Sequence, residues 1–276
     1  MAKGISMKTL IITTGVEPLL KKTLDSLWKA GKYIGDIIAI EFETPNDKYS
    51  NKFKALLAMH NGKVYSTSKS YKYYSLSRYK VTQDIITELK DQYDIFMLMD
   101  GDDIEIFEDI NPLFNMATEK ICCIEEHVEV FTDNGEMTIG SINHQWQGYC
   151  NVDVEHTEWW NNIRNMFMLN AGLVLGPPKL MLHMLDFVNY QIRMNPVTNV
   201  EQVWFNAYAR YYYPQNVKLV GIEWNYLSWF RNWEITGNGC IAKVGHYKKI
   251  NILHHAGITM MKNKPWDDNI PNRRII

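Results

Sequence analysis

Apolar and polar positions alternate along the first hundred residues in blocks that predict strands and helices in turn. The run Thr9–Thr14 is apolar and β-branched and stops at a glycine, which is typical of a buried strand. Glutamate and proline then open a helix with leucines on one face, since proline is tolerated in the first helical turn. Similar patterns predict strands over Asp36–Phe42, Lys63–Ser66 and Ile95–Met99, with helices over Lys52–Met59 and Leu76–Gln92. We therefore predict an α/β fold on a doubly wound, mostly parallel sheet.

The second half of the chain is less regular. Helical patterns cover Thr157–Met168, Pro178–Met194 and Val200–Tyr212, and Asn251–Leu253 is expected to form a late strand. No repeat, low-complexity tract or linker interrupts the sequence. We therefore expect a single domain over residues 1–276.

The composition is that of an ordinary globular protein, with 46% hydrophobic and 22% charged residues. Polar residues and prolines interrupt the most apolar stretch, Met166–Val188, so we expect no membrane span and no membrane partner. None of the four cysteines forms a C-x-x-C pair, which argues against a zinc site. We interpret them as reduced thiols of a cytoplasmic protein. The oligomeric state cannot be read from the sequence.

Two carboxylates flank one glycine directly after the strand Ile95–Met99, in Asp100-Gly101-Asp102. Ligands of parallel sheets bind beyond the carboxyl ends of the strands, and carboxylate oxygens suit Mg²⁺ or Mn²⁺. Asp103 follows at once, and such a density of like charge favours a neutralising cation. The turn therefore predicts a site for Mn²⁺ or Mg²⁺, although acidic triplets also occur in turns that bind no metal.

A second group of candidate residues lies near the end of the sequence: His254, His255, Gly257 and Lys264. Adjacent strand residues point to opposite faces, so only one histidine is expected to face a shared site. An imidazole nitrogen would complete the coordination of Mn²⁺. Gly257 would let the backbone approach a phosphate, and Lys264 would supply positive charge. The competing interpretation is a hydrogen-bonded core histidine and a surface lysine.

Taken together, these motifs resemble the retaining glycosyltransferases of family 8, the glycogenin and bacterial galactosyltransferase group with a GT-A fold. The matches are short islands in the family's order. Ile95–Phe114 resembles the metal-binding strand end and the helix after it, and Lys264-Pro265-Trp266 resembles a lysine-proline-tryptophan signature. The resemblance implies a Rossmann-like GT-A fold. It also implies a nucleotide-sugar half over about 7–115 and an acceptor and metal-completing half over about 116–276.

The resemblance also assigns roles to single residues. It implies that the metal ligands are Asp100, Asp102 and His254. It implies that the donor is bound by Thr13, Thr14, Arg78, Gly172, Gly257 and Lys264. It implies that the sugar is positioned for catalysis by Gln202, Glu201 and Asn170.

The implied activity is metal-dependent transfer of a sugar from a nucleotide sugar, expected to be a UDP-sugar, to an acceptor hydroxyl. The resemblance implies retention of configuration and a glycan or small glycoside as the acceptor. The sequence departs from the family at three places. Val203 replaces an acid of the family pattern, and Thr13, Thr14 and Gly15 stand where the family has an acid after the first strand. The interval from Gly257 to Lys264 is also longer than usual.

A basic stretch keeps other functions open. Residues 48–83 contain eight Lys or Arg, no acid and several tyrosines, which suits a nucleic-acid backbone with stacked bases. Abundant Lys, Asn, Ile, Tyr and Met are typical of AT-rich genomes, including viral ones, and a viral protein would act in the host cytoplasm. The first alternative is therefore a DNA-modifying glycosyltransferase acting on a hydroxymethylated base. The second is a catalytically inactive nucleotide-sugar-binding protein. A nucleotidyltransferase is disfavoured because no basic, glycine-rich loop follows Thr9–Thr14.

Overall fold

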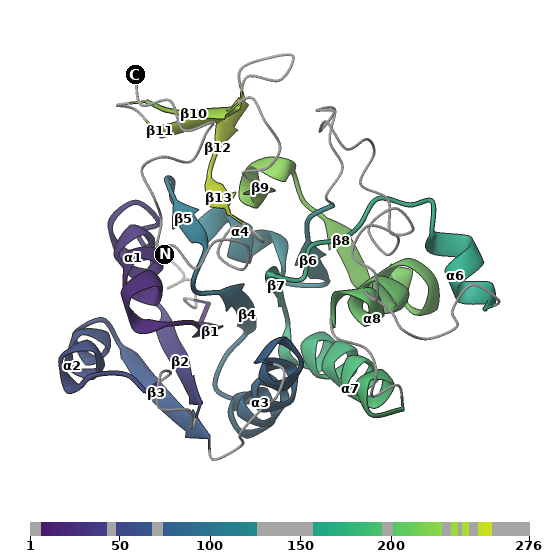
Figure 1. Cartoon of the computed structure of the whole chain (residues 1–276), viewed down its shortest axis with the longest axis horizontal. Helices are drawn as coiled ribbons and strands as arrows, with labels where there is room; N and C mark the ends of the chain where they lie inside the picture. The colour runs from purple at the N-terminus through teal and green to yellow at the C-terminus, as the bar shows by residue number, and fades with distance from the viewer. Residues whose placement is uncertain are drawn as a thin grey trace, which may run out of the picture.

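The computed structural model describes residues 7–42, 48–67, 74–125, 157–194, 201–227, 233–236, 239–242 and 248–255. Within them a seven-stranded sheet runs in the order β3-β2-β1-β4-β7-β6-β8 (Figure 1). Its four parallel strands are β1 (Thr9–Thr14), β2 (Asp36–Phe42), β3 (Gly62–Thr67) and β4 (Ile95–Asp100). These strands lie where the hydrophobic pattern predicts them.

Next to β4, one strand of the sheet runs in the opposite direction. Strand β7 (Leu173–Gly176) pairs antiparallel with both β4 and β6 (Ile121–Cys123), and β8 (Val217–Leu219) pairs parallel with β6. The prediction of an α/β fold on a mostly parallel sheet is therefore confirmed, with β7 as the antiparallel strand inside it.

Helices cover both faces of this sheet. Alternate residues of β1 point to opposite faces, so Ile11 belongs to one core cluster, while Leu10 and Ile12 belong to the other. The cluster of Ile11 contains side chains of α1 (Glu17–Lys29) and α2 (Asn51–Met59). The cluster of Leu10 contains side chains of α3 (Tyr74–Leu89) and α7 (Pro178–Met194). Figure 1 shows the two pairs of helices on opposite sides of the strands.

A small sheet joins the end of the described chain to the segment after β4. In the order β5-β13-β9, strand β13 (Ile252–His254) pairs antiparallel with β5 (Ile104–Ile106) and parallel with β9 (Tyr226–Leu227). A second three-stranded sheet, β10 (Trp233–Thr236), β11 (Gly239–Ala242) and β12 (Lys248–Ile250), lies beside it (Figure 1). The β5–β13 pairing places His254 opposite Ile104 and so beside the acidic turn.

The remaining elements are short, and two predicted helices differ from the expectation. Helix α6 (Glu158–Ile163) ends well before Met168, because the chain turns towards an isolated bridge between Leu169 and Glu125. The helix expected over Val200–Tyr212 is α8 (Gln202–Ala207) followed by a π-helical turn, η1 (Tyr208–Tyr212). The other short elements are α4 (Asn111–Met116) and the 3₁₀ turns η2 (Pro214–Asn216) and η3 (Ile222–Trp224).

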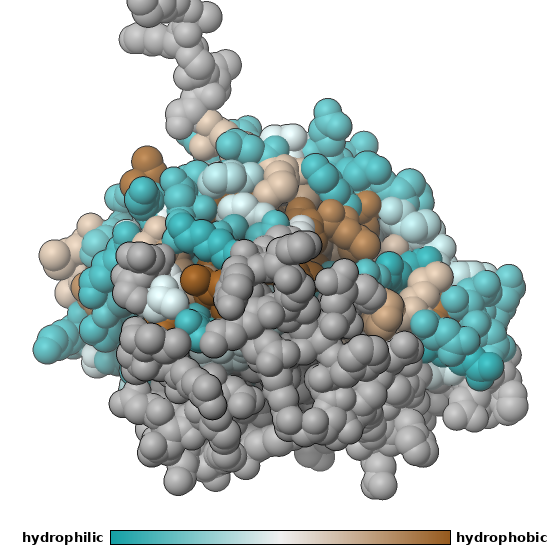
Figure 2. Space-filling model, turned by 90° about the horizontal axis from the view of Figure 1, so that it is seen from above, coloured by the Kyte–Doolittle hydropathy of each residue, from teal (hydrophilic) through white to brown (hydrophobic). Residues whose placement is uncertain are grey.

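Seen from the top of Figure 1, hydrophilic residues cover much of the described surface, and apolar residues gather in one area near its centre (Figure 2). Among the described helices, none combines the length and the apolar character needed to cross a bilayer.

Candidate functional site

The acidic turn after β4 lies tightly against the end of β1. The backbone N–H of Gly101 donates to the carbonyl of Thr14 over 3.1 Å. A Cβ atom at Gly101 would stand 2.6 Å from that same oxygen, so only glycine fits this close approach. The glycine between the two aspartates therefore has a packing reason that is independent of any ligand.

Asp102 is directed towards the β1–α1 turn. Its Oδ1 accepts a hydrogen bond from the backbone N–H of Val16 over 2.6 Å, at the start of α1. A Cβ on Gly15 would collide with this oxygen at 2.0 Å, so the turn is shaped around the Asp102 carboxylate. A carboxylate at a helix N-terminus is stabilised by the helix dipole. The structure thus gives Asp102 a capping role, and the resemblance-based assignment of Asp102 to the metal stays a prediction.

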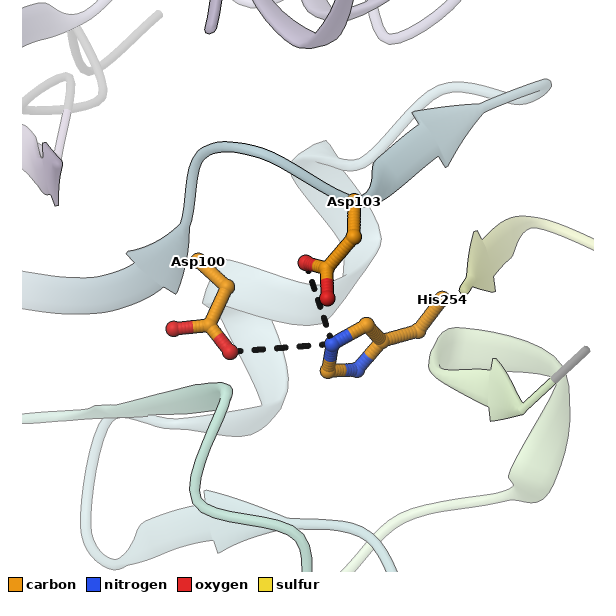
Figure 3. A group of neighbouring side chains, drawn as sticks. All are labelled: Asp100, Asp103 and His254. Carbon is orange, nitrogen blue, oxygen red and sulfur yellow. Dashed lines mark ion pairs between the residues drawn. The ribbon is translucent and has the colours of Figure 1, made fainter. Parts of the chain in front are cut away.

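Asp100, Asp103 and His254 form the one group of metal-binding side chains found among the described residues, with one ligand atom of each lying within 4.8 Å of the others. The Nε2 atom of His254 is 3.3 Å from Oδ1 of Asp103 and 3.6 Å from Oδ2 of Asp100. Figure 3 shows both carboxylates and the imidazole pointing towards a common point. Sequence analysis named Asp100 and His254 as ligands but counted Asp103 only as part of the acidic crowd.

The chemistry of this group fits a divalent cation such as Mn²⁺ or Mg²⁺. Oδ1 of Asp103 and Nε2 of His254 are buried and face each other over 3.3 Å, but neither forms an aligned hydrogen bond with any of the described residues. Buried polar atoms are rarely left in this state, and two carboxylates with an imidazole form a donor set that Mn²⁺ accepts. These orphaned atoms therefore support a cation site formed by Asp100, Asp103 and His254.

Neighbouring basic side chains favour the ionised form of the Asp103 carboxyl group. Burial by itself favours the neutral carboxyl, but the attraction of a His254 ring that is protonated on Nε2, with further contributions from His255 and Arg78, outweighs burial and lowers the pKa of Asp103 below its ordinary value. The carboxylate is therefore ionised at neutral pH. His255 lies on the other side of the strand end, with Nε2 3.6 Å from Oε2 of Glu105.

Hydrogen-bonded amides surround the other nitrogen of the His254 ring. Nδ1 of His254 is 2.9 Å from Oδ1 of Asn225, and Nδ2 of Asn225 donates to Oδ1 of Asn170 over 3.0 Å. The same oxygen of Asn170 accepts from the backbone N–H of Gly172 over 2.8 Å. Asn225 is a residue that sequence analysis missed. No local signal marks it, because its position depends on the pairing of β9 with β13.

Gly172 lies at the point where the two sides of the site meet. A Cβ there would stand 2.4 Å from Oδ2 of Asp100 and 2.5 Å from Cε1 of His254. Its backbone carbonyl accepts from the N–H of Asp100 over 2.7 Å. Gly172 thus borders the candidate metal ligands, while its predicted donor contact stays a prediction.

Arg78 links three elements through two carboxylates, of which that of Glu201 is buried. Its Nη1 forms an ion pair with Oδ1 of Asp100, and its Nη2 lies 2.8 Å from Oε1 of Glu201. Arg78 and Glu201 are both buried, at 6% and 3% exposure. The guanidinium therefore ties α3 and the residue before α8 to the end of β4.

The other predicted site residues lie in different places. Thr13 and Thr14 end β1 and are buried, and the hydroxyl of Thr14 donates to the carbonyl of Ile40. Gln202 begins α8, and its backbone carbonyl accepts from Nδ2 of Asn206 over 2.8 Å. Gly257 and Lys264 lie outside the described residues.

Comparisons with known proteins support the fold. A search with the sequence finds no matching family model and no matching curated protein. By structure, the chain is similar to the galactosyltransferase LgtC in complex with donor and acceptor sugar analogues, with a TM-score of 0.56 and 11% identity. The similarity covers 95% of this chain and 91% of that one. The chain therefore has the α/β fold of a GT-A glycosyltransferase, while membership of family 8 stays a prediction.

Proposed function

We propose that this protein is a metal-dependent glycosyltransferase that transfers a sugar from a nucleotide-sugar donor to an acceptor hydroxyl. The observation that carries the proposal is the group Asp100, Asp103 and His254 at the carboxyl end of β4, with two orphaned ligand atoms, in a chain with the GT-A fold. A divalent cation held there would neutralise the charge that develops on the departing nucleoside diphosphate.

The chain's own residues supply further parts of this proposal. Arg78 lies beside Asp100 with a second contact to Glu201, so its charge stands at the rim of the candidate cation site. A fixed cation at such a position stabilises negative charge on a leaving group without having to reorganise. Glu201 is a candidate acceptor for a sugar hydroxyl, because its Oε2 is buried without a hydrogen-bond partner among the described residues. Gln202, the next residue, is the candidate for positioning the reacting sugar.

The finer parts of the proposal come from the family resemblance. They are a UDP-sugar donor, Mn²⁺ as the ion, retention of configuration, and donor contacts from Thr13, Thr14, Gly257 and Lys264. A glycan or small glycoside is the acceptor we propose, since the structurally similar galactosyltransferase is described with an acceptor sugar analogue. No described feature favours a hydroxymethylated base or a loss of activity.

The proposal can be tested with a panel of nucleotide sugars and purified protein. We expect at least one donor to be hydrolysed slowly with Mn²⁺ and not after chelation, and we expect transfer when a glycan acceptor is added. Hydroxymethylated DNA is the comparison acceptor, and transfer to DNA alone would replace the proposed acceptor class. If no nucleotide sugar in the panel is hydrolysed and none is bound, the enzyme proposal is contradicted.

A further inference from the structure

We infer that Asn225 is a positioning residue that, together with Asn170, holds the His254 ring with its proton on Nδ1. The unprotonated Nε2 of the neutral ring then faces Asp100 and Asp103. The inference deepens the proposed function, because it rests on the candidate metal site, and it assigns a role to two amides that have no charge of their own.

The direction of each hydrogen bond follows from one backbone group. The N–H of Gly172 can only donate, so the Asn170 atom 2.8 Å away must be the amide oxygen. The Asn225 atom 3.0 Å from that oxygen must then be its NH₂ group. The remaining polar atom of Asn225 is therefore its oxygen, and it lies 2.9 Å from Nδ1 of His254. Nδ1 must carry a proton in order to donate to it.

This arrangement opposes the tautomer that the carboxylates would otherwise favour. Nε2 of His254 lies 3.3 Å from Asp103 and 3.6 Å from Asp100, so a proton on Nε2 would be attracted by both carboxylates. A neutral ring with its proton on Nε2 has no lone pair there to give to a cation. The hydrogen bond that a metal-binding histidine donates from its other nitrogen commonly sets both its tautomer and its orientation.

Burial strengthens the preference for one His254 tautomer that is set by the hydrogen-bonded chain from Gly172 through Asn170 and Asn225 to His254, which we call the relay. Asn170, Asn225 and His254 are 4%, 1% and 1% exposed, so water cannot readily replace a lost partner. A buried donor or acceptor without a partner is therefore unfavourable. The alternative tautomer would set the lone pair of Nδ1 against the oxygen of Asn225, and the chain of amides cannot reverse because it ends on the N–H of Gly172.

The relay also changes the interpretation of Asn170. An amide oxygen has two acceptor positions, and Gly172 and Asn225 occupy both of them. The oxygen of Asn170 is therefore committed to the relay. Through this oxygen Asn170 contributes to the site by way of His254, while the direct contact with the sugar that the family resemblance implies stays a prediction.

The test uses two readouts on the full chain that do not depend on sugar transfer. The first is the ¹⁵N spectrum of histidine-labelled, metal-free protein at a pH where the ring is neutral, with His254→Gln identifying the His254 signals. The second is Mn²⁺ affinity from the electron paramagnetic resonance signal of free Mn²⁺. We expect the wild-type spectrum to place the His254 proton on Nδ1.

Two substitutions at Asn225 separate the acceptor from the packing. Asn225→Leu keeps the branched shape and removes the acceptor, so we expect the proton to move to Nε2 and Mn²⁺ affinity to fall about 10- to 100-fold. Asn225→Asp keeps an acceptor, so we expect the proton on Nδ1 and an Mn²⁺ affinity within about tenfold of wild type. Asn189→Leu is the matched control, because Asn189 hydrogen-bonds Tyr79 and Gln83 away from the site. We expect it to change neither readout.

A wild-type ring with its proton on Nε2 would overturn the inference, as would Asn225→Leu protein that binds Mn²⁺ as tightly as wild type. If Asn225→Leu fails to fold, the position of the His254 proton in wild type and in Asn225→Asp still tests the inference. Wild-type protein that binds Mn²⁺ but hydrolyses no nucleotide sugar would remove the proposed function and leave the relay standing. Wild-type protein that binds no Mn²⁺ would overturn both.

Discussion

The two sides of the candidate site are built in different ways. Asp100 and Asp103 come from the carboxyl end of β4, a strand that pairs with β1 along its whole length. His254 and Asn225 come from the small sheet around β13, whose position depends on pairing with β5 and β9. The two ligands of the first side are close together in the sequence, directly after one strand. The second side forms only when distant segments meet, so cation binding reports on the assembly of both.

The two sides also differ in what holds their side chains. Asp100 is held by the buried charge of Arg78, whereas His254 is held by the neutral amides of Asn225 and Asn170. Removing a buried charge leaves another charge unpaired, which costs more than losing a neutral hydrogen bond. We therefore expect substitutions on the first side to affect stability most, and substitutions on the second side to affect cation binding most.

The largest effect on stability is expected from Arg78→Met. The substitution leaves the carboxylates of Glu201 and Asp100 without their guanidinium, and breaking a buried ion pair costs about 3–5 kcal/mol. Urea unfolding measures the change, and Arg78→Met combined with Glu201→Gln should recover part of it. A loss below about 1 kcal/mol, the range of exposed pairs, would contradict this account of the first side.

Gly172→Ala tests the contact between the two sides. The added methyl group would stand 2.4 Å from Asp100 and 2.5 Å from His254, so the two ligands must move apart. We expect Mn²⁺ affinity to fall about 100-fold, with a cost in stability of about 1–3 kcal/mol. Gly176→Ala at the end of β7 is the control, because its methyl group would meet Ile121 and neither ligand. Unchanged Mn²⁺ affinity in Gly172→Ala would show that the two sides do not share an ion.

A pair of matched substitutions separates the two aspartates of the acidic turn that follow Asp100. Asp103→Asn removes a buried carboxylate that faces His254, and we expect Mn²⁺ affinity to fall about 100-fold. Asp102→Asn keeps an oxygen for the N–H of Val16, and we expect a loss of about tenfold or less. Isothermal titration with Mn²⁺ measures both. The reverse order would give the ligand position to Asp102, as the family resemblance implies.

The smallest effect is expected far from the cation, at Glu41 on β2. Burial raises the pKa of Glu41, but hydrogen bonds from Lys54, Ser66 and the N–H of Tyr49 outweigh burial and lower the pKa below its ordinary value. A lowered pKa means that the stabilisation is present above the unfolded-state value and is lost as pH falls through the folded-state value. We expect Glu41→Gln to cost about 1 kcal/mol at pH 7 and almost nothing in strong acid.

Denaturant unfolding of wild type and Glu41→Gln, from pH 7 down to strong acid, measures how the stability cost of the substitution changes with pH. Glu88→Gln, on the exposed surface of α3, is the control. A cost for Glu41→Gln that stays constant with pH would exclude ionisation as its cause.

The first side of the site could largely be predicted from the sequence. The β-branched runs and the alternation of strands with helices locate β1 to β4, and the end of β4 locates Asp100. The second half of the chain was harder to predict, because its strands are too short to show a hydrophobic periodicity. The pairing of these strands decides which residues meet. The π-helical turn at Tyr208–Tyr212 and the early end of α6 show tertiary packing overriding a helical pattern.

The same reason explains which site residues were missed. Asp103 stands beside a recognisable motif, but only the β5–β13 pairing shows that its carboxylate faces His254. Asn225 carries no charge and no motif, and its role depends on three segments that meet in space. Local sequence therefore indicated the kind of chemistry and one side of the site, while long-range pairing decided the partners.

The most direct test of the central claim is the Mn²⁺ dependence of nucleotide-sugar hydrolysis, measured side by side for wild type, Asp103→Asn and His254→Gln. These two variants remove one ligand from each side of the site. We predict that wild type hydrolyses at least one donor only when Mn²⁺ is present, and that each variant loses about 100-fold or more of that activity. Hydrolysis that is independent of Mn²⁺, or that both variants retain in full, would contradict the account.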